Sequence, residues 1–115
     1  MNLTIQLPHA AADATAARDR ADRVLRFALT RFAREISAVR LRLVDENGPR
    51  GGVDQRCRVH VVLRTGDALS VEAVGRDPHA VIHDVCARMA RTVARRLSRL
   101  GARRIGPTRP PDVAY

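Results

Sequence analysis

The chain has 115 residues and a formal net charge of +9 at pH 7, and all of its basic residues except the histidines are arginine. This length suits a single domain with one modest core, and two cysteines are too few for a disulfide framework. No apolar run is long enough to cross a membrane, and the start lacks the basic region of a secretion signal. We therefore expect a cytoplasmic protein with an anionic partner.

The first two predicted elements are a short strand and a long helix. Apolar Leu3, Ile5 and Leu7 alternate with polar residues until Pro8, as in a half-buried strand. A helical pattern follows from about Asp13 to Glu35, and Asp13 or Thr15 could cap its start. Its expected core positions are Ala21, Leu25, Ala28, Leu29, Phe32 and Ile36.

Three further strands are predicted, because the apolar period then drops to two. A loop rich in Gly and acidic residues over 45–52 separates the first pair, and Thr65-Gly66-Asp67 gives a tight hairpin signal for the second. The expected inward positions are Val39, Leu41 and Leu43 in the first strand, Cys57, Val59, Val61 and Leu63 in the second, and Leu69, Val71 and Ala73 in the third.

A last helix is expected to begin at Asp77-Pro78, since Asp is a strong N-cap and Pro suits the first helical position. Gly101 is well placed to end it. Residues 1–101 would then form the domain, and 102–115, with three prolines and three arginines, a disordered tail. The expected apolar stripe is Ile82, Val85, Cys86, Met89, Val93, Leu97 and Leu100.

The element order is therefore β-α-β-β-β-α. Short connections predict an antiparallel meander for the last three strands. A sheet with one apolar face and two amphipathic helices to cover it gives an α+β two-layer sandwich, with four strands and both helices on one face.

Four arginines form a stripe on the last helix, because spacings of three, four and four keep residues on one side of a helix. They are Arg88, Arg91, Arg95 and Arg99. No acid lies between Asp84 and Asp112, so we expect the stripe to be free of acidic partners within the helix. A solvated face usually interleaves acids, and a bare cationic stripe favours contact with phosphates.

Two other basic surfaces are predicted. On the first helix, Arg20, Arg23, Arg31 and Arg34 surround Phe27, which either stacks on a base or touches a neighbouring loop. On the outer face of the sheet we expect Arg40, Arg42, Arg56, Arg58 and Arg64. Few aromatic residues accompany them, so phosphate contact or contact with a protein is favoured over base readout.

No catalytic motif stands out in the sequence. His79, His83 and Cys86 have a spacing that can hold a metal, but no fourth ligand is evident, and the two histidines could instead add charge to the basic face. The Gly-rich segment 48–52 does not match a phosphate-binding loop. We therefore expect a binding protein that is not an enzyme and has no metal, cofactor or small-molecule substrate.

Residues 36–100 resemble the ribosome hibernation-promoting factors, also known as ribosome-associated inhibitors or sigma-54 modulation proteins. The closest stretch is Ala73-Val74-Gly75-Arg76-Asp77-Pro78-His79-Ala80-Val81-Ile82-His83, and the start Met1-Asn2-Leu3-Thr4-Ile5 is also similar. The resemblance implies a fold related to double-stranded-RNA-binding domains. It supports Arg88, Arg91 and Arg95 as basic positions of the last helix. His79 and His83 depart from the family's Tyr and Asp.

The resemblance further implies a short-form factor that binds 16S ribosomal RNA in the decoding channel of the small ribosomal subunit, blocks mRNA and tRNA, and silences idle ribosomes. The candidate RNA-binding residues are Arg88, Arg91, Arg95, Arg99, Arg23, Arg31, Arg34, Arg40, Arg42 and Arg58. A general duplex-RNA-binding module and a protein-interaction adaptor are the alternatives. The oligomeric state is left open by the sequence.

Overall fold

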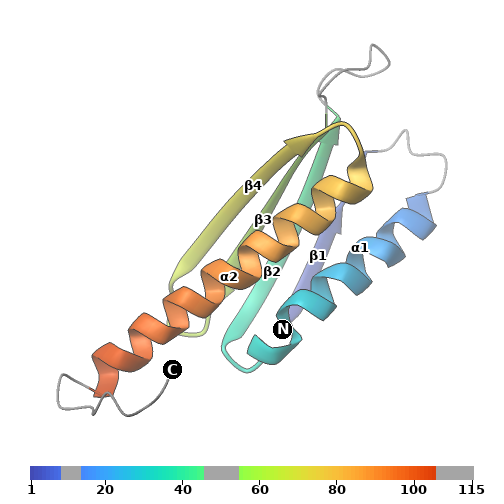
Figure 1. Ribbon diagram of the computed structural model, residues 1–115. Helices are drawn as coiled ribbons and strands as arrows, with labels where there is room; N and C mark the ends of the chain where they lie inside the picture. Colours follow the sequence, from blue (N-terminus) through green and yellow to red (C-terminus); the bar gives the residue numbers. More distant parts are fainter. Residues whose placement is uncertain (9–13, 46–54, 106–115) are drawn as a thin grey trace.

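The structure, a computed structural model, describes residues 1–8, 14–45 and 55–105. The expected order of elements is confirmed (Figure 1). It runs β1 (Asn2–Gln6), α1 (Ala14–Leu29), a 3₁₀ turn η1 (Thr30–Phe32), β2 (Ile36–Asp45), β3 (Gln55–Leu63), β4 (Ala68–Gly75) and α2 (Pro78–Ile105). The predicted loop after Asp45, the proposed cap Asp13 and residues 106–115 of the predicted tail lie outside the described residues.

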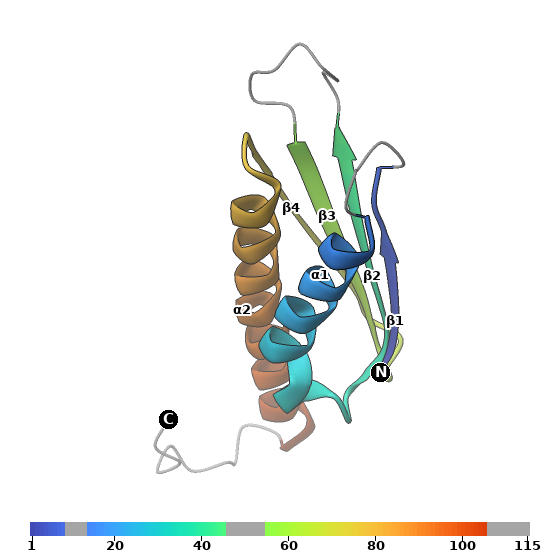
Figure 2. The same ribbon diagram turned by 90° about the vertical axis from the view of Figure 1, so that its right-hand side faces the viewer.

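The four strands form one sheet in the order β1-β2-β3-β4. The predicted meander of β2, β3 and β4 is antiparallel as expected, and β1 adds to the free edge of β2 in parallel, which makes the sheet mixed. Both helices cover the same face (Figures 1 and 2): α2 packs on β4 and β3, and α1 packs beside α2 and on β1. The α+β two-layer sandwich is confirmed.

The core between the layers is aliphatic. The residues predicted to point inward from β2 and β3 are all buried, as are Leu69 and Ala73 of β4. Leu25 and Leu29 of α1 meet Val85, Met89 and Val93 of α2 in the same cluster. Alternation in the strands and the 3.6-residue period of the helices therefore bring one apolar face from each element together.

The first helix is shorter than predicted. The α-helix ends at Leu29, and η1 and a turn connect it to β2, which starts at Ile36 rather than Val39. The hydroxyl of Thr30 donates a hydrogen bond to the Arg26 carbonyl, and Ala33 N bonds Thr30 O at 3.0 Å, which is the tighter 3₁₀ pattern. Ile36 matched the helical spacing by chance and is a buried strand residue.

The predicted start of α2 is confirmed and its predicted end is wrong. Asp77 accepts a hydrogen bond from the His79 backbone N–H at 3.1 Å through Oδ1, as an N-cap does, and the helix begins at Pro78. At the other end the helix continues through Gly101 to Ile105. A single glycine costs a helix only about 1 kcal/mol, so it does not have to terminate one.

Two glycines shape the ends of β4. Gly66 has a φ of +99° in the turn from β3 to β4, where Leu63 N bonds Asp67 O at 2.8 Å, so the hairpin signal at 65–67 is confirmed. Gly75 lies at the other end of β4. A Cβ atom there would lie 2.8 Å from Cγ2 of Val81, so the absence of a side chain lets the first turn of α2 pack closely on the strand.

Candidate nucleic-acid interface

Three of the four stripe arginines on α2 have no acidic partner among the side chains that the structure describes. Arg91, Arg95 and Arg99 are exposed, and no carboxylate among the described side chains contacts them. The buried residues Val85, Met89 and Val93 lie on the other side of the same helix. The amphipathic pattern of α2 therefore leaves three guanidinium groups exposed to solvent, and no described carboxylate neutralises them.

Arg88 is different, and the expectation of a wholly unpaired stripe is wrong there. Its Nε lies 3.2 Å from Oδ1 of Asp84, one turn earlier, and its Nη1 donates a hydrogen bond of 3.3 Å to the carbonyl of Glu72 on β4. Arg96 is also paired, at 3.5 Å, with Asp67 of the β3–β4 turn. These contacts tie the side of α2 that carries Arg88 to the edge strand.

Arg23 and Phe27 are exposed on α1 and lie one turn apart on the same side of the helix, and Arg31 is exposed in η1, four residues further along the chain. Phe27 is 91% exposed, so the alternative that it packs against a neighbouring loop is wrong. Arg31 places its guanidinium 4.6 Å from the centre of the Phe32 ring. The Phe27 ring is exposed to solvent and has basic residues four positions before and after it in the sequence, which suits stacking on a nucleobase.

Two side-chain contacts orient α1 between its neighbours. Arg18 donates a hydrogen bond to the Ile5 carbonyl of β1, and Nη1 of Arg20 lies 2.8 Å from Nε2 and 2.9 Å from Nδ1 of His79 at the start of α2. We call Arg23, Arg31, Arg91, Arg95 and Arg99 the helix-side arginines.

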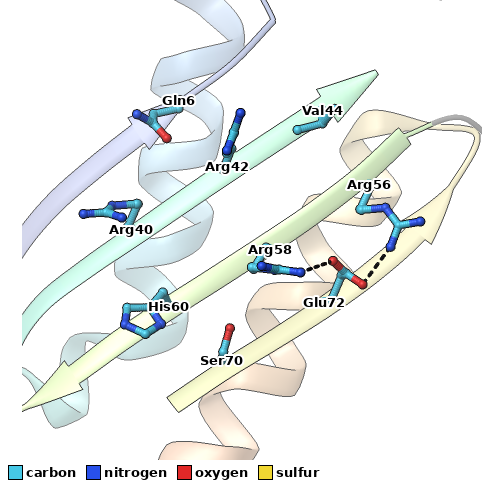
Figure 3. Close-up of a pocket in the computed structure, with 9 residues that line it drawn as sticks. All are labelled: Gln6, Arg40, Arg42, Val44, Arg56, Arg58, His60, Ser70 and Glu72. Atoms are coloured by element: carbon cyan, nitrogen blue, oxygen red, sulfur yellow. Dashed lines mark hydrogen bonds and ion pairs between the residues drawn. The ribbon is translucent and has the colours of Figure 1, made fainter. Parts of the chain in front are cut away.

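The predicted RNA-binding residues do not form one surface. Arg40, Arg42 and Arg58 lie on the open face of the sheet, with both helices behind it (Figure 3). Arg34 is exposed in the turn that follows η1, and its carbonyl accepts a hydrogen bond of 2.6 Å from Nε of Arg64. The helix-side arginines and the sheet arginines thus face in opposite directions.

Glu72 of β4 organises the open face, a role that spacing did not reveal. Its Oε1 lies 2.9 Å from Nη1 of Arg56 and its Oε2 lies 3.0 Å from Nη2 of Arg58 (Figure 3). The hydrogen bond from Arg58 is the main cause that lowers the pKa of this carboxyl from 4.5, and the charges of both arginines act in the same direction against partial desolvation. Glu72 therefore stays ionised at neutral pH.

This lowered pKa predicts a pH-dependent contribution to stability. The folded chain binds the Glu72 proton less tightly than the unfolded chain, so the contribution is complete above about pH 4.5 and is lost as the pH falls through the lowered value. Glu72→Gln should melt below the unsubstituted chain at pH 7, and the two melting temperatures should converge in acid. A difference that is the same at every pH would contradict this ion-pair role.

The possible metal ligands His79, His83 and Cys86 do not come together. Cys86 is buried in the core, whereas both histidines are exposed and His79 contacts Arg20. Among the described residues no group of three His, Cys, Asp or Glu is placed to hold a metal ion. Burial raises the pKa of Cys57 and of Cys86 to about 12, so both thiols stay protonated and act as core residues.

Within the part of the chain that the structure describes, no helix has the length and apolar character needed to cross a bilayer. No protein-family model matches the sequence, and no curated protein matches it.

Solved structures similar to this one include the following two. One is the N-terminal domain of Protein Y from Thermus thermophilus, with 21% identity, a TM-score of 0.63, and coverage of 83% of this chain and 98% of that one. The other is a ribosomal subunit interface protein from Coxiella burnetii, with 13% identity, a TM-score of 0.66, and coverage of 85% and 99%. The chain therefore has the fold of the Protein Y N-terminal domain and of a ribosomal subunit interface protein, which confirms the fold that the resemblance implied.

Proposed function

We propose that the chain is a ribosome-associated factor that binds the small subunit through its helix layer, obstructs the decoding channel and so silences translation. The observation that carries this proposal is the set of exposed, uncompensated arginines on α2, on a fold shared with a ribosomal subunit interface protein. A phosphate backbone is the anion that best matches several guanidinium groups spread over two helices. On this proposal the partner is 16S ribosomal RNA in the cytoplasm.

The mechanism requires no chemical step. The helix-side arginines would neutralise backbone phosphates, and Phe27 would stack on an exposed base between Arg23 and Arg31. The core between the sheet and the two helices keeps the bound domain folded, so mRNA and tRNA cannot occupy the volume that it fills. The domain would therefore exclude mRNA and tRNA sterically for as long as its binding free energy holds it on the subunit. Arg88, which is held by Asp84 and by the Glu72 carbonyl, contributes less to this contact than Arg91 or Arg95.

A co-sedimentation assay with purified ribosomal subunits over a salt series tests the proposal. Each neutralised phosphate contributes about 0.7–0.9 to the slope of log affinity against log salt, so the five helix-side arginines predict a slope of about −4. Excess tRNA and mRNA should displace the protein. No pelleting with small subunits at low salt contradicts the proposal. Equal binding to free hairpin RNA points instead to a general duplex-RNA module.

A further inference from the structure

The open face of the sheet concentrates positive charge on the side of the molecule that faces away from α1 and α2. Strand pairing arranges the side chains in two rows across the sheet. Gln6, Arg42, Arg58 and Glu72 form one row from β1 to β4, and Thr4, Arg40, His60 and Ser70 form the next. Figure 3 shows that these side chains, except Thr4, surround a common hollow together with Arg56 and Val44.

The charges in this hollow do not balance. Among the described residues that line it, Glu72 is the one carboxylate, and both of its oxygens are already engaged by Arg56 and Arg58. Among the described residues no carboxylate contacts Arg40 or Arg42. Arg42 also pairs directly opposite Arg58 across β2 and β3, an arrangement of like charges that destabilises a sheet. An anion between these arginines would offset that repulsion.

The site is partly preorganised. The ion pair with Glu72 engages only Nη2 of Arg58, so it restrains the guanidinium while leaving its other N–H groups for a ligand, which reduces the side-chain entropy lost on binding. The second row adds hydrogen-bonding groups beside Arg40, namely the ring of His60 and the hydroxyl of Ser70. An anion would therefore meet both positive charge and further hydrogen-bonding groups for its oxygens.

The dimensions favour a small ligand with several linked anionic groups. The hollow has a volume of about 440 Å³, inside the range of roughly 300–1,000 Å³ for small-molecule sites. Arg40 and Arg42 are anchored two residues apart along β2, about 7 Å, and Arg58 one strand away, about 5 Å. A single carboxylate is too small to contact all three guanidinium groups at these spacings, whereas two or more linked phosphates are large enough. Among the described residues that line the hollow, only His60 carries a ring, so recognition would fall on the phosphates and not on a base.

We propose that this hollow binds a small molecule carrying two or more linked phosphoryl groups, held by Arg40, Arg42 and Arg58. The role is binding alone, with no reaction at the site. Because the hollow lies on the face of the sheet that α1 and α2 do not cover, the ligand and an RNA on the helix layer can be bound together. The proposal goes beyond the ribosome-binding function and does not depend on it.

The test is a titration of the full chain with inorganic pyrophosphate, followed by calorimetry and by amide chemical shifts. The key variant is the double substitution Arg40→Gln/Arg42→Gln. Its matched control is Arg91→Gln/Arg95→Gln, which removes the same charge from the opposite face. We expect shifts on β2, β3 and β4, and affinity at least about tenfold lower in the sheet variant than in the control. Melting temperatures no lower than that of the unsubstituted chain would confirm that both variants fold.

Three outcomes would overturn the proposal. One is the absence of pyrophosphate binding to the unsubstituted chain. Another is an equal loss of affinity in both double variants, which would show that only the overall charge matters. The third is an RNA oligonucleotide that binds the sheet face in an Arg40- and Arg42-dependent way while pyrophosphate does not, which would assign the face to RNA.

Discussion

The double substitution Arg91→Gln/Arg95→Gln should weaken binding to the small ribosomal subunit by about a hundredfold at low salt. Each arginine lost from a phosphate contact removes a charge-assisted hydrogen bond, at about 1.4 kcal/mol or tenfold per residue. The slope of log affinity against log salt should also become shallower by about 1.4–1.8. Both residues are exposed on α2 and contact no described carboxylate, so the melting temperature should stay the same. Sedimentation at several salt concentrations measures all three.

Two controls make this result specific to the helix layer. Arg40→Gln/Arg42→Gln removes the same charge from the sheet face and should leave the salt slope of ribosome binding unchanged. Arg88→Gln should lower affinity less than Arg91→Gln and should cost some stability, because Arg88 contacts Asp84 and the Glu72 carbonyl. If the two double variants lose ribosome affinity equally, the helix face is not the contact.

Much of the fold could be predicted from the sequence, because period-two alternation in β3 and β4 and the turn at Gly66 are local signals. The errors lie where local signals overlap. Phe32 and Ile36 continue the spacing of α1, but Ile36 is buried in the sheet and Thr30 begins a 3₁₀ turn. The low helix propensity of Gly101 also suggested an end to the last helix, but α2 continues to Ile105.

Within the candidate interface, the sequence could predict which arginines are exposed and unpaired only where helical spacing alone decides it. This holds for Arg91, Arg95 and Arg99. The pairing of Arg88 had a signal in the sequence, since Asp84 lies four residues earlier. The contact between Arg96 and Asp67 had none, because it joins a helix to a distant turn.

The hollow on the sheet face was equally inaccessible to sequence reasoning. It depends on which residue of β2 stands opposite which residue of β3 and β4, and a shift of one residue would turn every side chain to the other face. That register places Arg42 against Arg58, and Arg58 against Glu72. The sequence supplied the arginines of this face, and tertiary structure supplied their arrangement.

Phe27 is the residue that can separate RNA stacking from simple charge attraction. At 91% exposure its ring makes no packing contribution that the fold would lose, so Phe27→Ala should leave the melting temperature unchanged. Loss of a stacked base costs about 1–3 kcal/mol, so affinity for the small subunit should fall by about tenfold. The salt slope should remain the same, since no phosphate contact is removed. Binding curves at two salt concentrations test both expectations.

The choice of replacement distinguishes a nucleobase from an apolar protein surface as the partner of Phe27. Leucine keeps the apolar area but has no π-face, whereas tyrosine keeps the ring. Stacking predicts that Phe27→Tyr binds like the unsubstituted chain and that Phe27→Leu binds as weakly as Phe27→Ala. Full binding by the leucine variant would mean that Phe27 contributes apolar area and not stacking, and that its partner is an apolar surface of a ribosomal protein. The helix-side arginines would then remain the RNA contact, and Phe27 would lie at its margin.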